Sequence, residues 1–129
     1  EVTLTLFDIA GQKRWRGMRA AYYKGSDGVI VVGDVTRKNS FSAIEEFWIK
    51  DISQHTNSPI MLLFANKCDL PSEMEDQEIE SICMRNGIKK FFRTSAKTGD
   101  NVHKGFHEII QQCIKKEILF PIMNPVIKP

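Results

Sequence analysis

Several features that mark other classes of protein are missing from this sequence. No apolar run approaches the roughly 20 residues that a helix needs to span a bilayer, and the longest cover residues 28–33 and 60–65. The 18 basic and 16 acidic residues are dispersed along the chain, which argues against a nucleic-acid-binding surface. Cysteine is scarce, and well-separated residues favour reduced thiols over a disulfide framework. The three cysteines are Cys68, Cys83 and Cys113.

The composition is that of one globular domain. The 129 residues are 42% hydrophobic and 26% charged, which is enough apolar side chain to build a core and argues against a disordered chain. Glu1 already lies within a strand-like pattern, so we expect the chain to begin inside a domain. Residues 1–117 are predicted to form this partial domain, and residues 118–129 an irregular tail, since Pro121 and Pro125 disfavour helix.

Four segments have the pattern of β-strands. Residues 2–7 alternate between polar and apolar side chains before a final apolar pair, which is the period of a strand. Residues 28–33 and 60–65 are unbroken apolar runs, typical of strands buried on both faces of a parallel sheet. Residues 91–95 are predicted to form the last strand.

Helical patterns alternate with these strands. Asn39 and Ser40 can cap a helix in which apolar side chains then recur at helical spacing. A second helix is expected over residues 75–86, because Gly87 is a good residue to end it, and a third begins near Asp100. Strands that alternate with helices predict an α/β fold with a largely parallel sheet.

Three short polar clusters follow three of the predicted strands, at residues 8–12, 66–69 and 95–97. In an open parallel sheet, ligands bind beyond the carboxyl ends of the strands. Each cluster alone could be a plain turn or a polar loop. All three in this order, each directly after a strand, indicate a nucleotide site.

The first cluster suits phosphate chemistry. Asp8 at the end of a strand can hold Mg²⁺, usually through water. The backbone N–H of Gly11 can approach a γ-phosphate closely because glycine has no Cβ. Gln12 can then orient an attacking water in line with that phosphate.

The second and third clusters suit guanine. The Asp69 carboxylate can accept hydrogen bonds from the ring N–H and the exocyclic amine of guanine, an arrangement that adenine lacks. The aliphatic stem of Lys67 can cover the base and sugar. The backbone N–H of Ala96 can donate to the guanine carbonyl, while Lys97 flanks the other face of the base.

These clusters and three further segments resemble a small GTPase of the Ras superfamily, most closely the Rab family. The resemblance extends from Glu1 to about Glu117. It implies a P-loop NTPase-like three-layer sandwich with a mostly parallel sheet, N-terminally truncated so that strands 3–6 of the family order 2-3-1-4-5-6 are present. The further segments are Tyr22-Tyr23-Lys24-Gly25, Asp34-Val35-Thr36 with Ser40-Phe41, and residues 91–99.

By position, the resemblance implies that GTP or GDP and Mg²⁺ are the ligands. Gln12 matches the catalytic glutamine, Asp8 the Mg²⁺-associated aspartate and Gly11 the γ-phosphate sensor. The implied nucleotide-binding residues are Asp8, Ala10, Gly11, Asn66, Lys67, Asp69, Ser95, Ala96 and Lys97.

The resemblance also implies regulator and effector proteins as partners. They would contact the second switch through Arg14, Trp15, Tyr22 and Tyr23, although the two tyrosines and the tryptophan suit a core equally well. The sequence departs from the Rab pattern where the family usually carries Trp, Glu, Phe and Tyr. The residues at these positions are Phe7, Lys13, Trp15 and Gly33.

The largest departure is that no segment matches Gly-x-x-x-x-Gly-Lys-Ser/Thr, the loop that cradles the phosphates in this family. The leading hypothesis is therefore a fragment of a Rab-like GTP hydrolase that binds GTP weakly or not at all. The alternative is a non-catalytic interaction module derived from a small GTPase. The resemblance implies a cytoplasmic location, or the cytosolic face of membranes if the native chain is longer. No cysteine for a lipid anchor follows Cys113.

Overall fold

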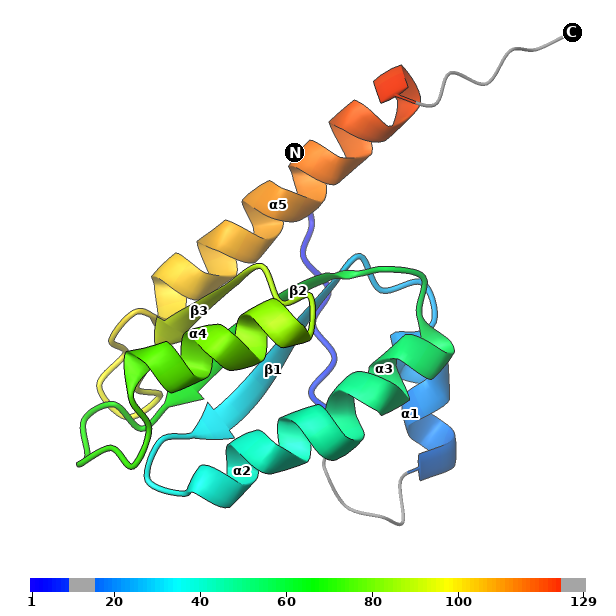
Figure 1. The fold of residues 1–129 in the computed structure, drawn as a ribbon. Coiled ribbons are helices and arrows are strands. Elements are labelled where there is room, and N and C mark those ends of the chain that lie inside the picture. Colours follow the sequence, from blue (N-terminus) through cyan, green and yellow to red (C-terminus); the bar gives the residue numbers. More distant parts are fainter. Residues whose placement is uncertain (10–15, 124–129) are drawn as a thin grey trace, which may run out of the picture.

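The computed structural model describes residues 1–9 and 16–123. Within them, helices and strands alternate along the chain, as expected for an α/β fold (Figure 1). The elements are α1 (Arg16–Tyr23), β1 (Gly28–Asp34), α2 (Lys38–Ala43), the π-helical turn η2 (Ile44–Trp48), α3 (Ile49–His55), β2 (Ile60–Asn66), α4 (Asp76–Arg85), β3 (Lys90–Arg93) and α5 (Val102–Met123).

The three strands form one parallel sheet in the order β1-β2-β3. β1 pairs with β2 from Gly28 opposite Ile60 to Asp34 opposite Asn66, and β3 pairs with the other edge of β2. Parallel neighbours need a crossover connection, and helices provide it on both faces of such a sheet. The alternation of elements in the sequence is thereby explained.

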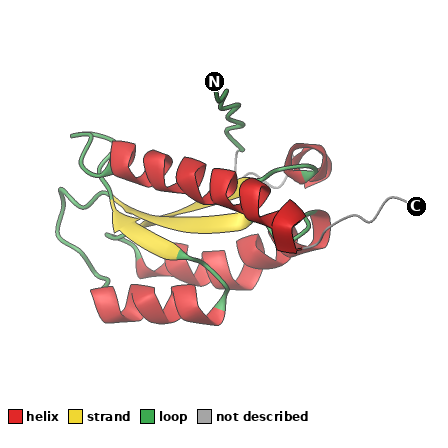
Figure 2. Cartoon of the chain, turned by 90° about the horizontal axis from the view of Figure 1, so that it is seen from above, coloured by secondary structure: helices red, strands yellow, loops and turns green. Residues whose placement is uncertain are grey.

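Two layers of helices cover the sheet, which Figure 2 shows between them. On one face, α5 packs against β2 and β1, where Ile109 meets Ile60 and Leu62 in a small core cluster. On the other face, side chains from the α2–α3 helix and from α4 form the larger cluster around Leu63. Both faces of β2 are therefore buried, as the unbroken apolar run predicts. The same prediction is wrong for β1, in which Val32 is exposed.

The predicted strand over residues 2–7 does not form. Residues 1–9 carry no helix or strand, and their apolar side chains are exposed, with Val2 at 66% and Leu6 at 63%. A strand persists only when its N–H and C=O groups pair with a neighbour. The described ladders of β1 and β2 join only the three strands of the parallel sheet, so alternation alone did not determine the structure of this segment.

The helix boundaries differ from prediction in two places. Helix α2 begins at Lys38, and its N-cap residue, Arg37, makes no side-chain capping hydrogen bond. Ser40 is predicted as a cap, but its hydroxyl instead binds the backbone carbonyls of Asp34 and Arg37. The last helix continues beyond residue 117 to Met123. A proline within a helix removes one backbone hydrogen bond, but Pro121 does not end this helix. Residues 118–123 are therefore helical, in contrast to the predicted irregular tail.

The α4 helix, by contrast, has the predicted limits. It spans Asp76–Arg85, and Glu75 and Glu78 form a reciprocal capping box at its start. Beyond its end, Gly87 has a φ of +66°, the left-handed conformation that glycine adopts without a steric cost. The signals for this helix are local, which explains why the sequence was sufficient.

The structure accounts for Gly33, where the Rab pattern usually has Tyr. A Cβ added at Gly33 would lie 2.8 Å from Cζ of Phe41. Phe41 on α2 is 1% exposed, so its ring fills the space over β1 that a side chain at position 33 would need. The glycine and the phenylalanine are therefore one packing unit.

We expect Gly33→Ala to lower the free energy of unfolding by about 1–3 kcal/mol, because the new methyl group overpacks the Phe41 ring. Urea denaturation followed by circular dichroism measures the change. Val32→Ala is the control, since the Val32 side chain is 59% exposed in the same strand and its loss should change the free energy by about 0.5 kcal/mol or less. Equal stability of Gly33→Ala and the parent chain would contradict this packing argument.

Candidate functional site

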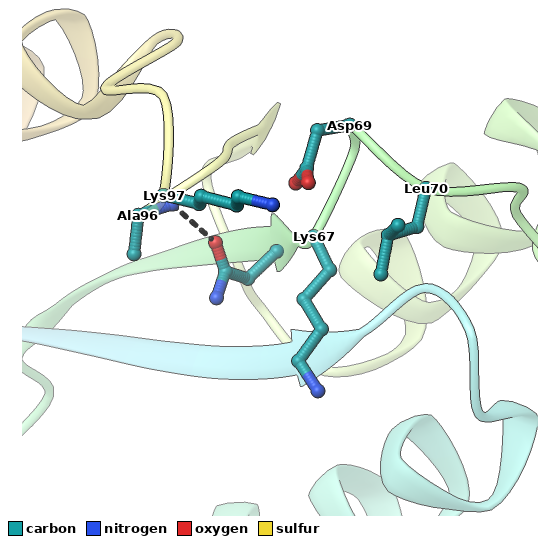
Figure 3. Close-up of a pocket in the computed structure, with 6 residues that line it drawn as sticks. Lys67, Asp69, Leu70, Ala96 and Lys97 are labelled. Atoms are coloured by element: carbon teal, nitrogen blue, oxygen red, sulfur yellow. Dashed lines mark hydrogen bonds between the residues drawn. The ribbon is translucent and has the colours of Figure 1, made fainter.

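The loops after β2 and β3 meet at the carboxyl edge of the sheet and enclose an open cavity of about 360 Å³ (Figure 3). The pairing of both strands with their neighbours in parallel brings the second and third predicted clusters together here. This volume is within the range of small-ligand pockets. The cavity is lined by Asn66, Lys67, Asp69, Leu70, Ala96 and Lys97.

The side chain of Asn66 joins the two loops. Its Oδ1 accepts a hydrogen bond from the Thr94 hydroxyl, at 3.2 Å. It also accepts from the backbone N–H of Ala96, at 3.1 Å, which is the dashed line in Figure 3. The Ala96 N–H, which the sequence assigns to a guanine carbonyl, therefore has a partner within the protein. A base carbonyl at this position would share or replace that bond.

Ser95 fixes Asp69. The hydroxyl of Ser95 donates to Oδ1 of Asp69 at 2.7 Å and accepts from the Thr98 N–H at 3.1 Å. Ser95 is fully buried, so this contact anchors the exposed Asp69 carboxylate to the interior. Ser95 therefore lies behind the cavity rather than in its lining.

Lys67 points away from Asp69, toward the end of β1 (Figure 3). Its Nζ lies 2.8 Å from Oδ2 of Asp34, and its φ of +67° is in the left-handed region that is uncommon for residues other than glycine. Lys97 extends from the opposite wall toward Asp69 (Figure 3). Of the two lysines that line the cavity, only Lys97 is therefore directed toward Asp69.

Asp34 and Leu70 lie outside the three predicted clusters but belong to the same region of the structure. Leu70 lines the cavity, and Asp34 reaches it through Lys67. The available signal for Asp34 is its position at the end of a strand, opposite Asn66 in the parallel register. The Lys67 amine, with help from Thr36, lowers the pKa of the Asp34 carboxyl to about 2.

The structure brings together the guanine-side residues but does not describe most of the phosphate-side cluster. Asp8 lies in the exposed N-terminal segment. In residues 1–9 and 16–123, no group of three or more His, Cys, Asp or Glu side chains is placed to hold a metal ion. The predicted residues outside the described part are Ala10, Gly11, Gln12, Lys13, Arg14 and Trp15.

The two tyrosines of α1 have different environments. Tyr23 is 4% exposed, and its hydroxyl donates to Oδ2 of Asp51 at 3.1 Å. Tyr22 is 39% exposed and lies against the ring of Phe7, with ring centroids 5.3 Å apart. In this structure Tyr23 is thus a core residue rather than a partner contact, whereas Tyr22 is accessible.

Arg19 fastens α1 to α3. Its side chain is nearly fully buried, and its Nε lies 3.0 Å from Oδ2 of Asp51. The guanidinium also lies over the rings of Phe47 and Trp48, 5.2 and 5.3 Å from their centroids, where cation–π attraction adds to the ion pair. α1 is therefore held by a specific buried contact.

A parallel sheet covered by helices on both faces, with a pocket at its carboxyl edge, belongs to the class of open α/β folds, which bind their ligands at that edge. The Ras family model matches residues 1–115, and the chain belongs to the Ras family. A curated relative from Dictyostelium discoideum, named as a ras-related protein Rab-5B, is 34% identical over 116 residues. The match covers 88% of this chain and 54% of the relative, so the chain spans about half the length of that protein.

The fold is accordingly of the Ras-like P-loop NTPase type, as the sequence predicts. The sequence identity between this chain and a Rab-named relative confirms the Rab-like character that the segments around Tyr22 and Asp34 indicate. Among the described helices, none has the length and apolarity required to cross a membrane.

We expect Asp51→Asn to lower the free energy of unfolding by about 1.5–3 kcal/mol, because a hydrogen-bonded charge facing buried Arg19 is lost. Burial, and secondarily the Asp51 carboxylate, raise the pKa of Tyr23 from 10.0 to about 12. The stabilisation linked to Tyr23 is therefore complete below pH 10 and is lost as the pH rises toward 12. In Asp51→Asn, the pKa of Tyr23 should fall while staying above 10.

Ultraviolet titration of tyrosinate and denaturant unfolding measure these two effects. Asp27→Asn removes the same charge from an exposed site and serves as the control. An Asp51→Asn variant as stable as the parent, with an unchanged Tyr23 titration, would show that the buried contact contributes nothing.

Proposed function

We propose that this chain is the guanine-recognising part of a Rab-like molecular switch that binds GTP and hydrolyses it to GDP. The observation that carries the proposal is the cavity in which Asn66, at the end of β2, converges with Asp69 and Ala96 from the loops after β2 and β3. Ras family membership supports a small GTPase. The assignment of individual roles rests on the chemistry of these side chains.

Guanine fits the donors and acceptors of the cavity. The Asp69 carboxylate would accept from the ring N–H and the exocyclic amine, while the Ala96 N–H would donate to the carbonyl in place of, or alongside, Asn66. Adenine has an amine where guanine has its carbonyl and lacks the ring N–H. Its binding would leave polar groups unpaired, which costs about 1–3 kcal/mol for each. Lys67 and Lys97 would flank the base.

Phosphate binding and hydrolysis extend the proposal beyond the base. In the family role, Gln12 orients the attacking water, and Asp8, Ala10 and Gly11 lie beside the phosphates and Mg²⁺. These 129 residues contain no Gly-x-x-x-x-Gly-Lys-Ser/Thr segment. The polypeptide itself should therefore hold a nucleotide mainly through its base, and weakly.

We further propose that the whole protein acts in vesicle trafficking or signalling, on the cytosolic face of membranes. The Rab name of the Dictyostelium discoideum relative supports this assignment. Regulators and effectors would contact the segment before and within α1, with Arg14, Trp15 and exposed Tyr22 as contact residues. Buried Tyr23 would act indirectly by holding α1 in place.

The second candidate function is a non-catalytic interaction module. A specific observation favours it, since the exposed rings of Phe7 and Tyr22 lie against each other, and Val2, Leu4 and Leu6 of the same N-terminal segment are exposed as well. Adjacent exposed apolar side chains are typical of protein–protein contact sites. The two functions differ in GTP turnover by the native full-length protein: phosphate release that Gln12→Leu abolishes supports the switch, and its absence in the parent supports the module.

Nucleotide titrations of the 129-residue chain test the base pocket. We expect GMP to shift the amide resonances of Asp69, Ala96 and Lys97 with a dissociation constant of about 1 mM, as for a small ligand held by few contacts. AMP should bind at least tenfold more weakly. GDP with Mg²⁺ should not reach submicromolar affinity, and a calorimetric titration that finds such affinity would contradict the proposed weak binding.

Asp69→Asn should change the preferred base. The asparagine keeps one acceptor for the ring N–H, but its amide N–H faces the exocyclic amine of guanine, so GMP should bind about tenfold more weakly. XMP has a carbonyl at that position and should bind better than GMP. Asp100→Asn, which neutralises an exposed carboxylate in the neighbouring loop, should keep the preference for GMP. A variant Asp69→Asn with unchanged preference would remove Asp69 from the site.

A further inference from the structure

Asp34 has no role in the chemistry described so far, although its side chain is only 16% exposed and meets the cavity wall. Both of its carboxylate oxygens have partners. Oδ1 accepts from the backbone N–H of Thr36 at 2.9 Å and from the Thr36 hydroxyl at 2.6 Å. Oδ2 lies 2.8 Å from Nζ of Lys67. The carboxylate therefore connects a turn to a cavity-lining side chain.

The backbone of Asp34 is fixed to the strand that carries the site. Asp34 stands opposite Asn66 in the β1–β2 register, and the N–H of Val35 donates to the Asn66 carbonyl at 3.0 Å. The N–H of Asp34 itself donates to the Ser40 hydroxyl at 2.8 Å. The Asp34 carboxylate thus starts from a defined position on β1, opposite the residue that precedes Lys67.

Lys67 lines the same cavity as Asp69 and precedes it by two residues in the chain, while its amine is paired with Asp34. Its side chain is half exposed, and the turn closed by the Leu70 N–H on the Lys67 carbonyl places Asp69 just beyond it. Figure 3 shows the amine directed away from Asp69 and toward the end of β1. A lysine released from Asp34 would be free to pair with Asp69.

We propose that Asp34 is a positioning residue for base recognition, which holds the Lys67 amine at the end of β1 and thereby keeps the Asp69 carboxylate available to the ligand. This inference rests on the proposed function of the cavity as a guanine site. The stem of Lys67 is held along one wall and its charge is neutralised by Asp34, so that of the two lysines in the cavity only Lys97 is directed toward Asp69. Thr36 orients the Asp34 carboxylate.

The variant Asp34→Asn separates this role from a structural one. The asparagine Oδ1 can still accept from both donors of Thr36, while the amide that replaces Oδ2 cannot accept from Lys67. The variant should fold, and unfolding curves and the amide spectrum check this. Lys67→Met keeps the apolar stem and removes the amine.

The test is a double-mutant cycle read by GMP and AMP titrations of the 129-residue chain, with amide shifts as the signal. In the parent background, Asp34→Asn should weaken GMP binding about fivefold, as for loss of a pair worth about 1 kcal/mol. In the Lys67→Met background, Asp34→Asn should have no further effect. The ratio of the AMP to the GMP dissociation constant cancels the general effect of the altered charge. Asp34→Asn should lower this ratio in the parent background and leave it unchanged in the Lys67→Met background.

A second readout is the ¹³C titration of the Asp34 carboxyl in the absence of nucleotide. Its pKa of about 2 should rise in Lys67→Met. In the parent, the stability linked to this lowered pKa is complete above the ordinary carboxyl pKa of 3.8 and is lost as the pH falls through about 2; in Lys67→Met this contribution should be smaller. Equal effects of Asp34→Asn in both backgrounds, or no effect in either, would overturn the positioning role while base binding stands. A parent chain that binds GMP and AMP equally would overturn the proposed function itself.

Discussion

The parallel ladder between β1 and β2 is the constraint on which the rest of the structure depends. β2 is the central strand, and Leu62, Leu63 and Ala65 are completely buried by helices on both faces. Because the register places Asp34 opposite Asn66, every loop that leaves this edge starts from a fixed point. The same strand receives β3 on its other side, which brings Thr94 and Ala96 to Asn66. A shift of one residue would reverse the faces of the strand and separate these partners.

The sequence predicted the parts of the fold whose signals are local or doubly buried. The apolar runs of β1 and β2 and the glycine after α4 each indicate their element without distant help. The segment 2–7 failed because alternation describes a possible strand, whereas a strand forms only against a partner. Ser40 failed as a cap because its hydroxyl serves the end of β1. Such competition between neighbours is invisible in a one-dimensional pattern.

For the candidate site, motif order predicted the lining residues Asn66, Lys67, Asp69, Ala96 and Lys97. It could not predict that Ser95 supports Asp69 from behind, nor that the Ala96 N–H already binds Asn66. These contacts join loops that are 26 and 30 residues apart in the chain. Likewise, Tyr23 is buried and Tyr22 exposed because only Tyr23 lies on the face of α1 that meets Asp51. That face is set by the tertiary packing of a short helix.

The position of β1 at the edge of the three-stranded sheet affects more than nucleotide recognition. On the outer side of β1 in the described sheet, backbone N–H and C=O groups form a template for pairing with a further strand. The exposed side chain of Val32 adds an apolar surface there. Natural sheets guard such edges with charge, proline or a bulge. β1 has only Asp34, at its very end and already engaged with Lys67. The first consequence of this edge should therefore be self-association of the polypeptide rather than a change in its chemistry. Self-association should set the highest concentration at which the polypeptide stays in solution.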